Sequence, residues 1–182
     1  MKRVMIIGQP GSGKSTLARR MGDITGLPVV HIDHIHWQPG WVERPREEKT
    51  RLCHEVEARE RWIFEGGHST TWPERLARAD MVVWLDVGVW TRLARVLRRT
   101  VTFYGRTRPD LPEGCPEQFS SEFLAFIWRT RHSARRNILR LLSEVPPGKA
   151  VHHLSTPREV AHFLDDLRRA YPDSAAPSAS SA

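Results

Sequence analysis

The glycine-rich segment near the N-terminus constrains this chain more than any other feature of its sequence. Residues 8–15 read Gly-Gln-Pro-Gly-Ser-Gly-Lys-Ser and fit the pattern G-x-x-x-x-G-K-[ST] throughout. The segment follows the apolar run 2–7 and precedes the helical pattern 15–26, which are the flanks that a phosphate-binding loop requires. Glycines let consecutive backbone N–H groups face one anion, and the next helix adds the partial positive charge of its N-terminus. The sequence therefore predicts a site for the phosphates of a nucleotide.

Two side chains of this loop are expected to take part in the chemistry. Lys14 can reach the β- and γ-phosphates of a nucleotide, and the Ser15 hydroxyl can ligate Mg²⁺. The residues expected to contact the nucleotide are Gly8, Pro10, Gly11, Ser12, Gly13, Lys14, Ser15 and Thr16.

The rest of the sequence excludes several classes of phosphate-loop protein. A guanine-specific GTPase needs an N-K-x-D element, but the single asparagine, Asn137, is followed by Ile138. The sequence contains no LSGGQ-type signature of a transporter ATPase, and 182 residues are too few for the usual motor or helicase core. A small phosphotransferase remains.

The positive charge of the chain is concentrated in one segment. The formal net charge is +7, from 28 basic and 21 acidic residues. Residues 92–140 contain eleven arginines and four acidic residues, so the whole excess lies there. A base-composition bias would explain why Arg outnumbers Lys, but it would not remove acidic residues from one segment. This segment indicates an anionic partner, either a nucleic acid or a phosphorylated small molecule.

Cysteine content and hydropathy narrow the cellular context. The two cysteines, Cys53 and Cys115, cannot build a disulfide framework or a four-cysteine zinc site. The sequence has no run of 18 apolar residues, and the apolar stretch 4–7 is too short for a signal peptide. We expect a soluble, cytoplasmic protein.

Apolar runs alternate with helical patterns along the chain. The alternation is typical of an α/β fold with a largely parallel sheet. We expect one domain over residues 1–171, and a disordered tail over the Ser-, Ala- and Pro-rich residues 172–182. The expected strands are 2–7, 27–32, 62–64, 81–85 and 150–154, and the expected helices are 15–26, 45–61, 91–104, 116–143 and 158–170.

Five segments carry a resemblance to a known family. They are GQPGSGKST at 8–16, LPVVHIDHIHWQPGW at 27–41, WIFEGG at 62–67, RLARADMVVWLD at 75–86 and RRTVTFYGRTRPDLPEGCPEQF at 98–119. In them the chain resembles the adenylate-kinase-like P-loop kinases, and within these the group named DNA topology modulation proteins. The resemblance implies a three-layer P-loop NTPase fold, with a parallel five-stranded sheet of order 2-3-1-4-5. It also implies an Arg-rich helical lid inserted at about residues 99–131.

A lid of this kind gives the arginines of the basic segment specific roles. Phosphoryl transfer spreads charge over three oxygens, which permanently charged guanidinium groups can stabilise. We expect Arg99, Arg106 and Arg108 to be catalytic, and Arg129, Arg131 and Arg135 to bind substrate phosphate. The solvated helix faces are expected to hold Arg92, Arg95 and Arg140.

Residues after the second and third predicted strands are candidates for binding the molecule that accepts the phosphoryl group. Asp33 could orient an acceptor hydroxyl or accept its proton, although a helix cap is the alternative. Trp37 and Trp41 could stack on a flat acceptor or could anchor their loop. Arg75 is a candidate for an acceptor phosphate, with an exposed helical arginine as the alternative.

Acidic residues at the ends of predicted strands are candidate ligands of the metal ion. The resemblance places Glu65 where an acidic residue holds Mg²⁺ through water, and Gly66 and Gly67 where an acceptor approaches. Asp86 is a second acidic candidate, with a strand-end cap as the alternative. The histidines at 31, 34 and 36 would share one face of a strand, where hydrogen-bonded side chains are favoured over a zinc site.

Two classes of function follow. The first is an ATP- and Mg²⁺-dependent phosphotransferase, expected to be a monomer, which transfers the γ-phosphate to a nucleotide or another small phosphorylated or hydroxylated acceptor. The second is a nucleic-acid-binding ATPase that affects DNA topology, or a polynucleotide 5′-kinase. The sequence disfavours the second class because it contains no helix-turn-helix, zinc-finger or RNA-binding signature.

Overall fold

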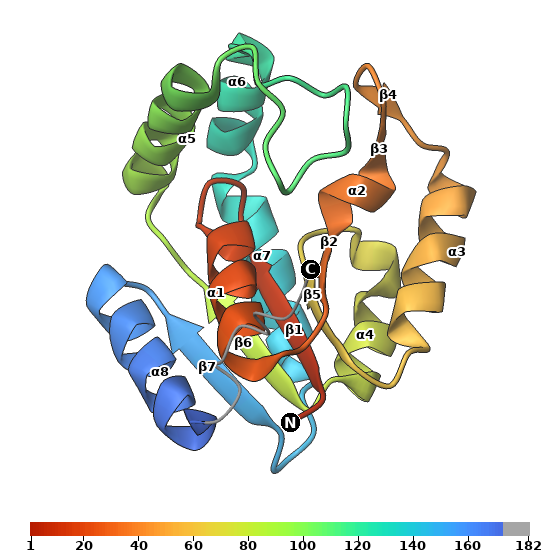
Figure 1. The fold of residues 1–182 in the computed structure, drawn as a ribbon, viewed down its shortest axis with the longest axis vertical. Coiled ribbons are helices and arrows are strands. Elements are labelled where there is room, and N and C mark those ends of the chain that lie inside the picture. Colours follow the sequence, from red (N-terminus) through yellow and green to blue (C-terminus); the bar gives the residue numbers. More distant parts are fainter. Residues whose placement is uncertain (173–182) are drawn as a thin grey trace, which may run out of the picture.

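The computed structural model describes residues 1–172, which form a five-stranded parallel sheet with helices on both faces (Figure 1). The strand order, β2-β5-β1-β6-β7, confirms the predicted topology. Apart from Pro172, the predicted tail lies outside the described residues. The strands are β1 (Arg3–Gly8), β2 (Val29–His31), β5 (Trp62–Glu65), β6 (Met81–Leu85) and β7 (Ala150–Leu154).

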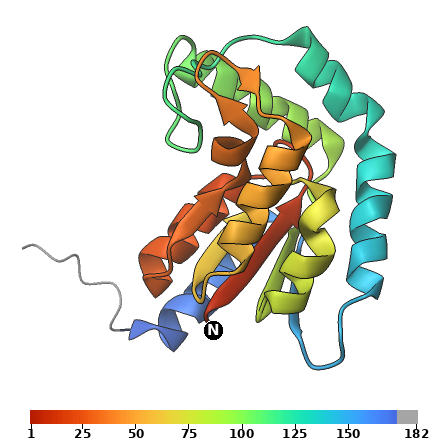
Figure 2. The same ribbon diagram turned by 90° about the vertical axis from the view of Figure 1, so that its right-hand side faces the viewer.

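The helices divide between the two faces of the sheet. α1 (Lys14–Thr25) and α8 (Pro157–Ala170) cover one face, where Leu17 and Phe163 enter the core. α3 (Arg46–Glu57), α4 (Trp72–Arg78) and α7 (Arg131–Ser143) cover the other, where Leu76 and Ile138 are buried. In Figure 2, α7 and α8 lie on opposite sides of the sheet. Within residues 1–172, no helix is long and apolar enough to cross a membrane.

The strands have the apolar character of a sheet that is covered on both faces. Residues 4–7 and 82–85 are buried without alternation, because each strand contributes to both cores. This is the pattern from which the central strands were predicted, and β6 and β7 have the predicted bounds.

Two predicted elements differ from the structure. The strand expected at 27–32 covers only Val29–His31 and is followed by the short helix α2 (Ile32–His36) and a hairpin of β3 (Trp37–Gln38) and β4 (Val42–Glu43). The helix expected at 116–143 is two helices, α6 (Ser121–Arg129) and α7, which separate at Thr130.

The residues predicted to form a lid, about 99–131, comprise the end of α5 (Val89–Phe103), the lid loop (residues 104–120) and α6. The lid loop lies against the β3–β4 hairpin at the top of the molecule (Figure 2). Gly40 N donates to Gly114 O over 2.9 Å, and Trp41 Nε1 donates to Pro116 O over 3.0 Å. The loop is therefore attached to the hairpin that follows β2 as well as to the helices on either side of it.

A buried ion pair links α3 to α4. Arg75 is fully buried, with its Nε 3.1 Å from Glu57 Oε1 and its guanidinium 3.6 Å from the centroid of the Phe64 ring. Arg75 also donates to the Gly66 carbonyl and to the Thr71 hydroxyl. These contacts satisfy the charge internally, which is the condition under which a buried arginine is tolerated.

The substitution Glu57→Gln is expected to lower the free energy of unfolding by about 3–5 kcal/mol, because it leaves the buried Arg75 charge without its counter-ion. Urea denaturation measures the change. Glu55→Gln, which removes an exposed partner of Arg51 on the same helix, is the control and is expected to cost less than about 1 kcal/mol. Equal losses in the two variants would contradict this account.

Candidate active site

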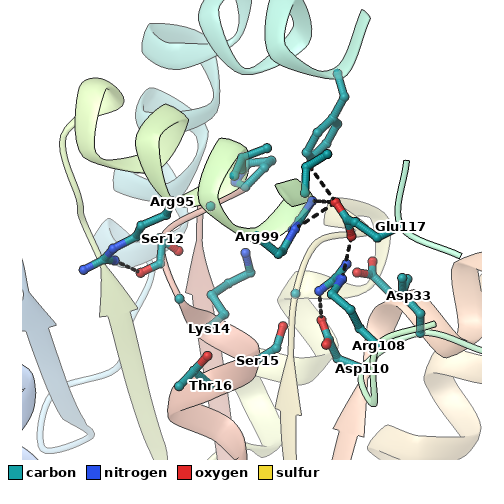
Figure 3. Close-up of a pocket in the computed structure, with 18 of the residues that line it drawn as sticks. Ser12, Lys14, Ser15, Thr16, Asp33, Arg95, Arg99, Arg108, Asp110 and Glu117 are labelled. Carbon is teal, nitrogen blue, oxygen red and sulfur yellow. Dashed lines mark hydrogen bonds and ion pairs between the residues drawn. The ribbon is translucent and has the colours of Figure 1, made fainter. Parts of the chain in front are cut away.

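A cavity of about 1280 Å³ lies at the carboxyl edge of the sheet, between the phosphate loop and the lid. In open α/β sheets this edge forms the ligand crevice. All eight predicted loop residues line the cavity: Gly8, Pro10, Gly11, Ser12, Gly13, Lys14, Ser15 and Thr16. The side chains of Lys14, Ser15, Arg99, Arg108 and Asp33 converge on it (Figure 3).

The phosphate loop has the backbone conformation that its glycines permit. Gly11 has φ +79°, and a Cβ at this position would lie 2.7 Å from the carbonyl oxygen of Arg92. Lys14 Nζ donates to the carbonyl of Gln9 over 3.2 Å, so the side chain folds back across the loop. The loop thus has a compact turn in which a larger residue at position 11 could not pack.

Two arginines of α5 support the outer side of this loop. Arg92 is 1% exposed, and its Nη1 donates to Pro10 O over 3.2 Å; Arg95 Nη1 donates to Ser12 O over 2.7 Å (Figure 3). The expectation that both are solvated is therefore wrong. The sequence signal was present, since residues 92, 95, 96 and 99 have the spacing of one helix face.

The lid arginines Arg99 and Arg108 are held by one buried carboxylate. Glu117 Oε1 accepts from Arg99 Nε over 3.1 Å and from Thr100 Oγ1 over 3.0 Å, while its Oε2 accepts from Arg108 Nε over 2.7 Å. Arg108 Nη1 also donates to Asp110 Oδ2 over 2.5 Å (Figure 3). The network ties α5 to the lid loop through contacts that the local sequence pattern does not predict.

Glu65 faces the cavity from the end of β5, and Asp33 faces it from α2, directly after the adjacent strand β2. Glu65 Oε1 lies 2.8 Å from His31 Nδ1 and is buried. Burial and the neighbouring Glu65 raise the pKa of Asp33 to about 6, although Lys14 and Arg108 oppose the change. Asp33 therefore titrates close to neutrality, which suits a group that exchanges a proton with a hydroxyl.

The acceptor candidates Trp37, Gly66 and Gly67 line the cavity, as does Trp41. The two indole rings pack edge-to-face with centroids 5.3 Å apart. Gly66 has φ +112°, and a Cβ there would lie 2.1 Å from Ile32 Cγ2. Glycine is required at this position because the first turn of α2 passes directly over it.

Five predicted arginines do not line the cavity. Arg75 is enclosed by its contacts with Glu57 and Phe64, which corrects the expectation that it binds an acceptor phosphate. Arg106 is exposed at the narrow base of the lid loop, where its own carbonyl accepts from Glu117 N. The remaining three, Arg129, Arg131 and Arg135, lie beyond the cavity on α6 and α7.

The break between α6 and α7 explains the positions of these last three arginines. α7 runs back along the sheet from Thr130, away from the lid (Figure 1). Arg129 is exposed, Arg131 lies 4.1 Å above the Trp128 ring, and Arg135 Nη2 donates to Asp86 Oδ2 over 2.9 Å. Asp86 is thereby paired and does not line the cavity as a second metal ligand.

The histidines do not share one strand face as predicted. His34 and His36 lie on α2, and His31 ends β2. Each has a hydrogen-bond partner: Glu65 for His31, Pro109 O for His34 and Lys49 for His36. In the part of the chain that the structure describes, no group of three or more His, Cys, Asp or Glu residues could hold a metal ion.

An apolar wall of the cavity was also absent from the sequence prediction. It comes from α5, α6 and the residues just before α6, and its members are Leu97, Phe103, Phe119, Phe123 and Phe126. The arginines of residues 92–140 make the sequence of this segment polar on average. Only the packing of α5 against α6 brings the segment's aromatic residues to one side.

A glycine-rich anion loop, a helix N-terminus behind it and a crevice at the carboxyl edge of a parallel sheet define a P-loop nucleotide-binding protein.

Comparisons with known proteins narrow this class. The chain is 28% identical over 169 residues to shikimate kinase from Paracidovorax citrulli (strain AAC00-1), covering 88% of this chain and 80% of that protein. It is 30% identical over 110 residues to cytidylate kinase from Pyrobaculum aerophilum, covering 53% of this chain and 59% of that protein. No family model matches the chain.

Solved structures of two kinases have a similar fold. Shikimate kinase from Acinetobacter baumannii, in complex with shikimate, aligns with a TM-score of 0.57 at 17% identity, over 93% of this chain and 92% of that one. Shikimate kinase from Bacteroides thetaiotaomicron aligns with a TM-score of 0.53 at 17% identity, over 93% and 97%. The predicted fold class and the prediction of an enzyme of the kinase type are confirmed.

Asp33→Asn is expected to stabilise the ligand-free protein at pH 8. The raised pKa of Asp33 means that folding disfavours its charged form, so its cost is present above pH 6 and disappears as the pH falls towards the unfolded value, 3.8. The difference between these pKa values corresponds to about 3 kcal/mol at most. Thermal denaturation at pH 8 and pH 4 measures the change, with exposed Asp23→Asn as the control. An advantage as large at pH 4 as at pH 8 would exclude this cause.

Proposed function

We propose that the protein is an ATP-dependent kinase that transfers the γ-phosphate to a hydroxyl group of a small molecule. The convergence of Lys14, two lid arginines and a perturbed carboxylate on one cavity carries this proposal. The curated relatives support it, because both are named as kinases of small molecules.

The donor nucleotide is assigned to the phosphate loop. Its backbone N–H groups and the N-terminus of α1 would hold the β- and γ-phosphates, with Lys14 adding a mobile positive charge. The base would lie towards Pro157 and Val160 of α8, which line the same cavity.

Mg²⁺ is assigned to Ser15 and Glu65. Both line the cavity, and Glu65 uses one oxygen for His31 and keeps the other available. This donor set fits Mg²⁺, which takes few protein ligands and completes its shell with phosphate oxygens and water. When bound, the ion neutralises charge on the donor phosphates.

The reacting groups would then be arranged by Asp33 and the lid. Asp33 would orient the acceptor hydroxyl and take its proton as the oxygen attacks the γ-phosphorus. Arg99 and Arg108 would stabilise the negative charge of the transferring group, and the apolar wall would exclude water.

Lys14→Met is expected to lower kcat for transfer from γ-labelled ATP by at least about 100-fold, because it removes a positioned charge from the transition state. Lys2→Met, which changes an exposed lysine beside β1, should leave the rate unchanged. Retained turnover in the Lys14 variant, with its fold verified by circular dichroism, would contradict the proposal.

A nucleic-acid-binding ATPase or a polynucleotide 5′-kinase is the alternative, consistent with the narrower resemblance to the DNA topology modulation group. Five arginines of the basic segment support it, since each is exposed without a side-chain bond within residues 1–172: Arg98, Arg106, Arg129, Arg136 and Arg140. The other six bond groups of the chain itself, which weakens this alternative.

Salt dependence distinguishes the two functions. We expect no saturable binding of a duplex oligonucleotide, measured by fluorescence anisotropy at near-physiological salt, and no label transfer to oligonucleotide 5′ ends. Binding that weakens by about 10³-fold or more between 50 and 200 mM salt would instead favour the alternative. That the protein acts as a monomer in the cytoplasm, with one domain over residues 1–171, stays a prediction.

A further inference from the structure

The acceptor end of the cavity has an unusual balance of charge for a site that meets phosphate. We define this end by α2, the β3–β4 hairpin, the end of β5, the lid loop and the adjoining end of α5. The charged side chains that line it are four carboxylates, Asp33, Glu65, Asp110 and Glu117, and two arginines, Arg99 and Arg108.

Both of these arginines are neutralised by carboxylates of the chain itself. Glu117 lies between them, 3.1 Å from Arg99 and 2.7 Å from Arg108, and Asp110 lies 2.5 Å from Arg108. Arg108, Asp110 and Glu117 are all buried. The two positive charges are matched by two negative ones, and the N–H groups that these carboxylates leave free are already assigned to the transferring phosphoryl group. No fixed positive charge is therefore left over for an anionic group of the acceptor itself.

The surrounding elements supply no further positive charge. Three nearby cations have carboxylate partners and do not line the cavity: Arg44 with Glu48, Lys49 with Glu43, and Arg75 with Glu57. Two others, Arg46 on α3 and Arg106 on the lid loop, are exposed and also lie outside the lining. Burial lowers the pKa of both His36 and His68, which keeps these rings uncharged at neutral pH.

Three of the four lining arginines without a carboxylate partner lie towards the donor end. Arg19 and Arg20 belong to α1, behind the phosphate loop. Arg95 bonds the phosphate loop at Ser12, and exposed Arg98 lines the cavity from the next turn of α5. Arg19, Arg20 and Arg95 are thus positioned for the nucleotide and not for the acceptor.

Asp33 remains as the available polar group of the acceptor end. Within residues 1–172 its carboxylate has no hydrogen-bond partner, while its neighbour Glu65 is held by His31. The paired indoles of Trp37 and Trp41 form the apolar side of the same space. A carboxylate opposite an aromatic pair accepts hydrogen bonds from hydroxyl or ammonium groups, and the rings pack on C–H faces or on a cation.

We propose that the acceptor of this kinase carries no anionic group: it is a neutral polyol or sugar-like compound, or one that bears an amine. The inference rests on the proposed function and specifies the substrate class of its acceptor site. A carboxylate or phosphate monoester would be desolvated beside Asp33 and Glu65 without a counter-charge, which is costly. The acceptors in the relatives' names, shikimate and cytidylate, carry such groups, so this chain would differ from both.

Matched acceptors test the inference directly. Transfer from γ-labelled ATP is measured with cytidine against cytidine 5′-monophosphate, and with glucose and glucosamine against gluconate. The neutral or amine-bearing member is expected to have a kcat/KM at least about tenfold higher. Preference for the anionic member of either set would overturn the inference.

A binding measurement tests whether the acceptor end takes an anionic group, even if none of these compounds is the natural acceptor. The protein is first saturated with Mg²⁺ and the β,γ-imido analogue of ATP, which occupies the donor phosphate positions. Inorganic phosphate is then titrated by calorimetry. Wild type should show no phosphate binding, whereas Asp110→Asn, which frees one positive charge at Arg108, should bind phosphate.

Glu113→Gln is the matched control, because Glu113 is an exposed acid of the same loop that does not line the cavity. It should behave as wild type. Phosphate binding by loaded wild type would overturn the inference, as would its absence in a folded Asp110→Asn variant; Glu117→Gln replaces that variant if it does not fold. Failure to bind the ATP analogue, with no transfer to any acceptor, would contradict the proposed function itself.

Discussion

The site depends on where the backbone N–H and carbonyl groups of the phosphate loop find their hydrogen-bond partners. If the loop's N–H groups face an anion, several of its carbonyls must find donors elsewhere, since a buried carbonyl without a partner is costly. Lys14 donates a hydrogen bond to the carbonyl of Gln9. Arg92 and Arg95 donate to the carbonyls of Pro10 and Ser12, respectively. Because both arginines lie on α5, the same contacts fix the helix that carries the lid. The shape of the loop and the position of the lid are thus one constraint.

The lid is built on the same principle of internal pairing. Glu117 joins Arg99 and Arg108, and backbone contacts attach the lid loop to the β3–β4 hairpin. Asp33, which precedes that hairpin, therefore faces groups whose charges are already matched. Its raised pKa follows from this setting, in which burial and Glu65 outweigh Lys14 and Arg108. The lid would thus act by closing a dry site as well as by supplying charge.

Sequence reasoning predicted the parts of the fold that depend on local pattern. β1 and β6 are apolar runs of strand length, β7 has its predicted bounds, and the order of the five strands matches the expected topology. The prediction from the sequence was wrong where a helix or strand is short or interrupted. α2 and the hairpin after it are polar and brief, and Thr130 separates two helices within one continuous helical pattern. Such details are set by contacts with distant segments, which local pattern does not contain.

The sequence by itself determined the phosphate loop, the sheet and the chemical types available at the strand ends, because these follow from spacing along the chain. Only the tertiary structure decided which arginines meet the cavity. Arg75 forms an ion pair with Glu57 and Arg135 with Asp86. Arg92 and Arg95 instead donate hydrogen bonds to carbonyls of the phosphate loop. An arginine's role depends on which carboxylate or carbonyl lies within about 3 Å of it, and for these four arginines that partner is 18 to 83 residues away in sequence.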